Sequence, residues 1–170
     1  MGQYQQLETV KWQCSLTGKL EEFSIIKIVE MVNVLGRNVK AAHIYWVPVT
    51  GNLSCDDDYL EPLDNPDYNL QQDFRAYRQK LGLLTPEQVH QIRQNYKLNQ
   101  EQYALVLGMD CQQLVDIENG LRLQSDQQES LFRLSQDEVI FEQLAKSKRP
   151  VLATDQYQSV QKILNDIGKP

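Results

Sequence analysis

Polar side chains near the middle of the chain have the chemistry needed to read double-stranded DNA. The amide of Gln112 can form paired hydrogen bonds with the N6 and N7 atoms of adenine in the major groove. Gln100 begins a predicted helix, where its amide and the helix N-terminus can hold a phosphate and so position the DNA backbone. The candidate DNA-contacting residues are Gln100, Cys111, Gln112, Gln113, Asp116 and Arg122.

The other candidates have different expected roles around Gln112. Gln113 is expected to read or approach the bases beside it. Cys111 and Asp116 fall on the outer face of the same predicted helix, so we expect them to shape selectivity. Arg122 is expected to contact the phosphate backbone and to help position it.

Two short helices joined by a tight turn are predicted to hold these side chains. The segment 99–120 opens with an N-capping asparagine, and Ala104 is small where two helices approach closely. Gly108 permits the left-handed backbone conformation at the turn. This is the pattern of a helix-turn-helix, whose second helix places its N-terminal residues in the major groove. The alternative is a three-helix core without a role in DNA binding.

Further helix signals surround this motif. A connecting helix is predicted over 71–82, and a Thr-Pro-Glu-Gln sequence at 85–88 supplies an N-cap and a capping box for the next helix. Two more helices are predicted over 126–134 and 136–145. An amphipathic stretch after Pro150 is expected to dock on its own chain, with partner binding as the alternative. The residues expected in the helical core include Leu107, Leu114 and Ile117.

The segment 99–120 resembles the Xre family of bacterial regulators and the lambdoid phage repressors. Its Asn-Gln opening, its Ala-x-x-x-Gly spacing and its Glu-Asn-Gly close at 118–120 match the family without a gap. The resemblance implies a five-helix DNA-binding domain that works as a dimer on palindromic sites.

The charge distribution argues against tight DNA binding. The chain carries 17 basic and 23 acidic residues, and residues 81–147 alone have a net charge of −5. We therefore expect modest and strongly salt-sensitive affinity for DNA. A protein-interaction module that has lost DNA binding is the alternative function. The basic residues available for phosphates in this half include Arg93, Lys97, Arg122, Arg133 and a basic run at 146–149.

The first 50 residues are predicted to form β structure. Residues 29–35 and 39–47 are rich in β-branched and aromatic side chains, and Gly-Arg-Asn at 36–38 supplies a turn between them, so a hairpin is expected. Residues 52–69 are expected to be irregular, because their Asp, Asn and Pro residues favour turns.

Two similar pentads, 14–18 and 47–51, lie where the Cys-x-x-Cys-Gly knuckles of a zinc ribbon would lie. With the helical half, this layout resembles antitoxins of the MqsA type over residues 12–144. That family implies a zinc-binding domain that contacts a toxin and a C-terminal domain that dimerises and represses the operon. Of four expected thiolates only Cys14 remains, so we predict no metal and no other cofactor. Apolar packing is expected instead around Ile26, Val34, Val39, Ile44 and Trp46.

No group of residues in the sequence indicates catalysis. The two histidines, His43 and His90, lie in different predicted domains, and no nucleophile signature or phosphate-binding glycine loop occurs. The acidic run 56–58 is more typical of a solvated turn than of a cation site. We therefore predict no enzymatic activity. We also predict a cytoplasmic protein without a membrane segment, because the three cysteines are scattered and the sequence shows neither a signal sequence nor a long apolar stretch.

The sequence thus predicts an α+β chain in four parts. Residues 1–69 form a zinc-ribbon-like β domain without metal, 70–83 a connecting helix, 84–147 the helix-turn-helix domain and 148–170 a tail with an amphipathic helix. The predicted function is a sequence-specific transcriptional repressor, acting as the antitoxin of a type II toxin–antitoxin pair that regulates its own operon. The expected partners are operator DNA, a second copy of the chain and a cognate toxin.

Overall fold

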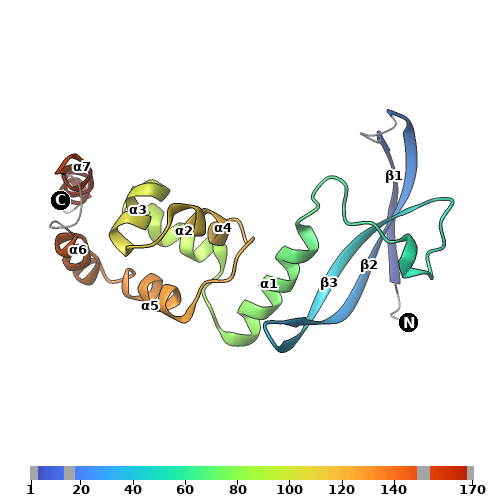
Figure 1. The fold of residues 1–170 in the computed structure, drawn as a ribbon, viewed down its shortest axis with the longest axis horizontal. Coiled ribbons are helices and arrows are strands. Elements are labelled where there is room, and N and C mark those ends of the chain that lie inside the picture. Colours follow the sequence, from blue (N-terminus) through green and yellow to red (C-terminus); the bar gives the residue numbers. More distant parts are fainter. Residues whose placement is uncertain (1–3, 14–17, 149–153, 168–170) are drawn as a thin grey trace. The chain divides into compact units, whose positions relative to one another are not determined.

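The computed structural model describes residues 4–13, 18–148 and 154–167. These residues form a three-stranded antiparallel sheet followed by seven helices, which is an α+β fold (Figure 1). The chain divides into two compact units, the sheet unit (Met1–Leu81) and the helical unit (Gly82–Pro170).

The sheet has the strand order β1 (Tyr4–Gln13), β2 (Leu20–Val34), β3 (Arg37–Pro48). The predicted hairpin is confirmed as β2 and β3, but its turn is shorter than predicted. Leu35 and Gly36 both have positive φ angles, 47° and 78°, as a two-residue hairpin turn requires. Strand β1 lies within the 50 residues predicted to form β structure, but its bounds were not predicted, because it is a polar edge strand with almost every side chain exposed and lacks a hydrophobic signal.

Apolar side chains fill both faces of the sheet. Phe23, Ile25 and Trp46 form one buried cluster, and Ile26, Ile28 and Val47 form the other. Neighbouring residues of a strand point to opposite faces, so the two clusters lie on opposite sides of the sheet. The predicted apolar packing is confirmed, with four of its five residues buried and Ile44 partly buried.

The zinc site that the resemblance implies does not fit the sheet unit. Val47, which stands in the place of a thiolate ligand, is fully buried in an apolar cluster. The thiol of Cys55 donates to Asp57 over 3.6 Å. Residues 14–17 of the first pentad lie outside the described residues. Within the described ranges, no group of three or more His, Cys, Asp and Glu side chains is arranged to hold a metal ion.

The segment after the sheet covers the outer edge of β3. The prediction of an irregular segment over 52–69 is confirmed for 52–67, apart from the short 3-10 helix η1 (Asp56–Asp58), but Tyr68 and Asn69 already belong to a helix. Leu60 pairs with Trp46 through two backbone hydrogen bonds. Helix α1 (Tyr68–Leu81) runs along β3 (Figure 1), and the amide of Asn69 bonds both the N–H and the C=O of Ile44. The predicted connecting helix therefore packs as part of the sheet unit, where it covers a strand edge.

A buried histidine also ties α1 to the sheet. His43 is only 5% exposed, and its two ring nitrogens contact Glu30 of β2 at 2.8 Å and Asp73 of α1 at 2.6 Å. The hydroxyl of Tyr45 donates to the same oxygen of Glu30. Burial, the hydrogen bond to Glu30 and its charge raise the pKa of Tyr45 well above its ordinary value, so the phenol stays protonated. This polar cluster has a structural role in the sheet unit.

The helical unit contains six helices among its described residues. They are α2 (Pro86–Asn95), α3 (Gln100–Leu107), α4 (Cys111–Glu118), α5 (Asp126–Leu134), α6 (Glu138–Ser147) and α7 (Thr154–Ile167). Capping boxes begin α2, α3 and α5, because each N-cap side chain accepts from the third helical residue, whose Gln side chain bonds back. Local sequence therefore fixes where these helices start.

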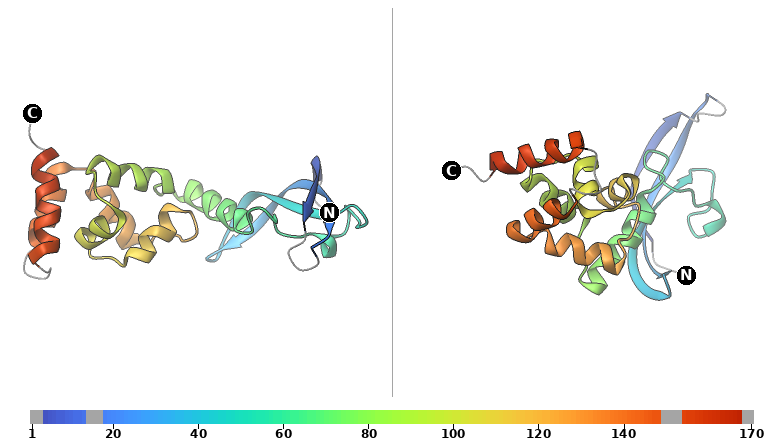
Figure 2. Two further views of the ribbon diagram at one scale, coloured as in Figure 1. Left: turned by 90° about the horizontal axis from the view of Figure 1, so that it is seen from above. Right: turned by 60° about the vertical axis from the view of Figure 1, so that its left-hand side comes forward.

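One apolar core joins the six helices. Leu107, Leu114 and Ile117 are buried in it, as predicted. The same core includes Val160 and Leu164 of α7, so the C-terminal helix docks on its own chain, and further views show it beside α6 (Figure 2). None of the described helices is long and apolar enough to cross a membrane.

Candidate nucleic-acid interface

Helices α3 and α4 are joined by a three-residue turn whose ends are both fixed by local hydrogen bonds. Gly108 ends α3 with a φ of 70°, a left-handed conformation that favours glycine. Asp110 caps α4 by accepting a 3.0 Å hydrogen bond from the backbone N–H of Gln113. A Cβ atom on residue 108 would lie 2.7 Å from the Lys148 Nζ, so this lysine lies directly over the turn.

The inner side of α4 is held by a buried ion pair. Glu118, whose side chain is 2% exposed, accepts from Arg93 Nε at 2.7 Å and from Arg93 Nη2 at 2.8 Å. The amide nitrogen of Gln100 donates to the same carboxylate at 2.9 Å. The network therefore joins α2, α3 and α4 at fixed positions.

Opposing effects act on the pKa of Glu118. Burial raises it, but hydrogen bonds from Arg93 and Gln100 and the charge of Arg93 outweigh burial and leave the pKa below its ordinary value. The carboxylate therefore stays ionised inside the unit. His90 lies at the edge of this network, with its Nδ1 atom 3.0 Å from Arg93 Nη2.

This network corrects the expectation that Arg93 is available for phosphates. Its side chain is 7% exposed, and Nη1 also donates to the carbonyl of Leu98. The helical spacing contains a signal for this, because Arg93 follows the buried Val89 by four positions and so lies on the same face of α2. Its acidic partner lies 25 positions away, which the spacing does not identify.

The outer face of α4 brings three of the six candidate residues together. Gln112 is exposed, and its Nε2 donates to Asp116 Oδ1 at 2.8 Å. The other carboxylate oxygen of Asp116 lies 3.7 Å from the Nε of Arg122. Gln112, Asp116 and Arg122 thus form a connected polar group, which we call the outer-face group. The four-residue spacing of Gln112 and Asp116 could have indicated this pair.

The structure places the other three candidates apart from the outer-face group. Gln113 accepts a 2.9 Å hydrogen bond from Gln128 of α5. Cys111 is partly buried and packs against the apolar core. Gln100, predicted to contact a phosphate, uses its amide nitrogen to bind Glu118.

Most basic side chains between residues 82 and 147 are paired with acids. Between residues 82 and 147, four of the five are in ion pairs, namely Arg93 with Glu118, Arg122 with Asp116, Arg133 with Glu129 and Lys146 with Glu142. The pairs other than Arg93–Glu118 are partly exposed, so a phosphate can compete for their cations. This pairing limits how much positive charge residues 82–147 offer to DNA.

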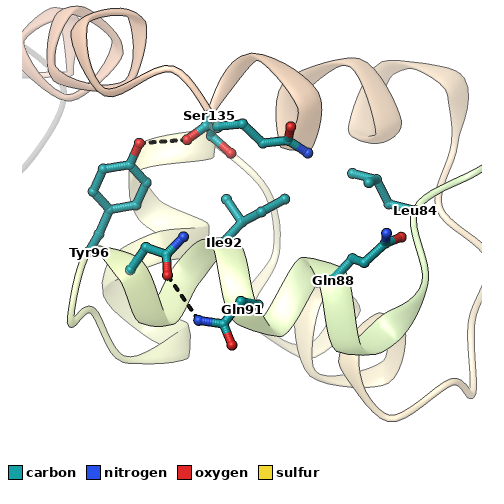
Figure 3. Close-up of a pocket in the computed structure, with 8 residues that line it drawn as sticks. Leu84, Gln88, Gln91, Ile92, Tyr96 and Ser135 are labelled. Carbon is teal, nitrogen blue, oxygen red and sulfur yellow. Dashed lines mark hydrogen bonds between the residues drawn. The ribbon is translucent and has the colours of Figure 1, made fainter.

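A pocket of about 320 Å³ lies between α2 and the corner that joins α5 to α6 (Figure 3). The hydroxyl of Tyr96 donates to the carbonyl of Ser135 at 2.6 Å, and the hydroxyl of Ser135 donates to the carbonyl of Phe132. Burial, followed by the charges of two nearby acids, raises the pKa of Tyr96 to about 12. Both hydroxyls are thus engaged, so the pocket offers hydrogen-bonding amides without an activated nucleophile. Its lining consists of Leu84, Gln88, Gln91, Ile92, Asn95, Tyr96, Ser135 and Gln136.

Comparison with known proteins gives no match. No protein-family model matches the chain, and neither the curated proteins nor the solved structures contain a significantly similar one.

Proposed function

We propose that the helical unit is a helix-turn-helix DNA-binding domain of the Xre type and that the chain is a sequence-specific transcriptional repressor. The observation that supports this best is the α3–turn–α4 arrangement, with a capping box before α3, the left-handed Gly108 and the Asp110 cap before α4. In such an arrangement the N-terminal residues of the second helix enter the major groove. Gln112, the second residue of α4, is exposed.

The outer-face group supports the assignment of roles. Gln112 reads a base edge, and Arg122, whose side chain is about half exposed, contacts a neighbouring phosphate. Lys148 lies over the turn between α3 and α4 and supplies a further cation beside that turn. Gln113 and Cys111 contribute through the shape of α4, because one pairs with α5 and the other packs on the core.

The biological context of this proposal is a homodimer that represses its own operon as an antitoxin. It rests on the motif resemblance and on the layout of a β region before a helical region. In this context the sheet unit contacts the toxin without zinc, since Val47 occupies a thiolate position inside an apolar cluster. The proposal describes a binding protein and assigns no catalytic residue.

A gel-shift titration of the full chain tests the proposal. The probes are the duplex upstream of its own gene and a scrambled duplex of equal composition, at low and at near-physiological salt. We expect selective binding of the upstream duplex, with an affinity that falls steeply as salt rises. Failure to bind either duplex at low salt would contradict the proposal.

A protein-interaction module is the second candidate function. The net charge of −5 over residues 81–147 and the pairing of most of their cations favour it. Binding to a protein through packing need not weaken as salt rises, whereas binding through phosphates does. The salt response of any complex therefore separates the two functions.

A further inference from the structure

We infer that Asp116 is a positioning residue, which holds the amide of Gln112 in the orientation that selects adenine over guanine. The inference rests on the proposed DNA-binding function and adds to it a base preference and the residue that sets it. The contact that carries it is the 2.8 Å hydrogen bond from Gln112 Nε2 to Asp116 Oδ1, one helical turn away on α4.

The carboxylate determines which way the amide faces. An ionised Asp accepts hydrogen bonds and donates none, so it pairs with the NH₂ group of Gln112 and repels the amide oxygen. The second carboxylate oxygen of Asp116 lies 3.7 Å from Arg122 Nε, so both carboxylate oxygens face donors. Asp116 therefore holds the amide in one of its two orientations.

The amide held in this way still offers a donor and an acceptor to a base. The NH₂ group has two hydrogens, so it can donate one to Asp116 and still donate the other to a base beside the amide oxygen. Adenine presents the complementary pair, an N6 donor beside an N7 acceptor. Guanine presents two acceptors, O6 and N7, and the fixed amide oxygen of Gln112 would face one of them. The arrangement therefore favours adenine and rejects guanine.

A free amide would have a weaker preference, since its own donor and acceptor still match adenine but its orientation is no longer fixed. Without Asp116, Gln112 can rotate its NH₂ group toward the acceptors of guanine. A merely structural role for the Gln112–Asp116 pair would change the thermal stability of the chain but leave its base preference alone. Base preference is therefore the measurement that separates the two roles.

The experiment is a binding selection by the full chain from duplexes with a randomised central region, at low salt. The proteins are wild type, Asp116→Ala, Asp116→Asn and Gln112→Ala, and the last identifies the base position that Gln112 reads. Asp126→Ala is the control, because it removes the same charge from the exposed first turn of α5. Thermal unfolding of each variant checks that it folds.

At the Gln112 position we expect wild type and Asp126→Ala to prefer adenine over guanine by about tenfold. For Asp116→Ala the preference should fall clearly below that of wild type and of Asp126→Ala, while DNA is still bound. Asp116→Asn, which is nearly isosteric, should give an intermediate ratio because its amide can pair with either orientation of Gln112. It provides the test should the alanine variant not fold.

The other outcomes overturn the inference in separable ways. An unchanged adenine preference in folded Asp116 variants, or a wild-type site without adenine, contradicts the positioning role and leaves the proposed function standing. Complete loss of DNA binding by folded Asp116→Ala also contradicts it, since Asp116 is assigned selectivity rather than affinity. No enrichment of any sequence by wild type refutes the proposed function and the inference together.

Discussion

Two acidic residues of α4, two positions apart, have opposite environments. Glu118 is buried on the inner side and is held by Arg93 and Gln100. Asp116 is partly exposed on the outer side and contacts Gln112 and Arg122. A step of two residues along a helix reverses the face on which a side chain lies. One short helix thus has one carboxylate that joins it to neighbouring helices and another that contacts polar side chains at its outer side.

The largest expected effect lies on the inner side. Glu118→Ala leaves Arg93 buried without its partner, so we expect a loss of about 3–5 kcal/mol in the free energy of unfolding. Asp116→Ala, at the partly exposed pair, should lower it by less than about 1 kcal/mol. Urea denaturation monitored by circular dichroism measures both. Equal losses in the free energy of unfolding for the two variants would contradict the difference between the inner and outer sides of α4.

The next largest expected effect is on DNA affinity and concerns the outer side of α4. Gln112→Ala removes a side chain without a buried partner, so we expect unfolding to be nearly unchanged. Affinity for the preferred duplex should fall by about 1–3 kcal/mol, with a relaxed preference at one base position. Anisotropy titration with the preferred duplex and its single-base variants measures this. Gln91→Ala, an exposed amide on α2, is a matched control expected to bind as wild type.

A smaller effect on stability is expected at the turn between α3 and α4. Gly108→Ala places a side chain at a φ of 70°, which should cost about 1–2 kcal/mol of stability. Gly82→Ala is the control for backbone strain, because its φ is 66° and no atom lies near its Cβ position. The amine of Lys148 is the end of a flexible side chain and can move, so we expect similar losses at the two positions. A much larger loss at Gly108 would show that Lys148 is held rigidly over the turn.

The smallest expected effect is the pH dependence of the inner side. The pKa of Glu118 is lower in the folded chain, so its contribution to stability is present at neutral pH and is lost as pH falls through that lowered pKa. Wild type should therefore lose more stability than Glu118→Gln between about pH 5 and pH 3. Urea midpoints across this range measure the difference. Parallel pH profiles would contradict an ionised Glu118 in the folded chain.

The helical unit was largely predictable because its signals are local. Capping residues such as Thr85, Asn99 and Ser125 determine where helices begin, through hydrogen bonds to residues only three positions further along the chain. The sheet unit was less predictable, since the polar strand β1 is defined by its pairing with β2. Likewise, the position of His43 between two carboxylates depends on α1, which begins 25 residues later in the chain.

The candidate site shows the same limit. The α3–turn–α4 segment and the exposed position of Gln112 follow from spacing within 22 residues. The burial of Arg93 and the engagement of Gln100 by Glu118 arise from packing between helices, which spacing along one helix does not reveal. The sequence therefore identified the position of α4 better than it identified which polar side chains are already bonded to other helices.

The central claim is that the outer side of α4 is the DNA-binding surface. The most direct test is chemical-shift mapping of the ¹⁵N-labelled full chain by NMR as the duplex upstream of its own gene is added at low salt. We predict the largest changes at the side-chain amide of Gln112, the guanidinium of Arg122 and the first turn of α4, with β1 to β3 little affected. Changes confined to the sheet unit, or none at all, would contradict the claim.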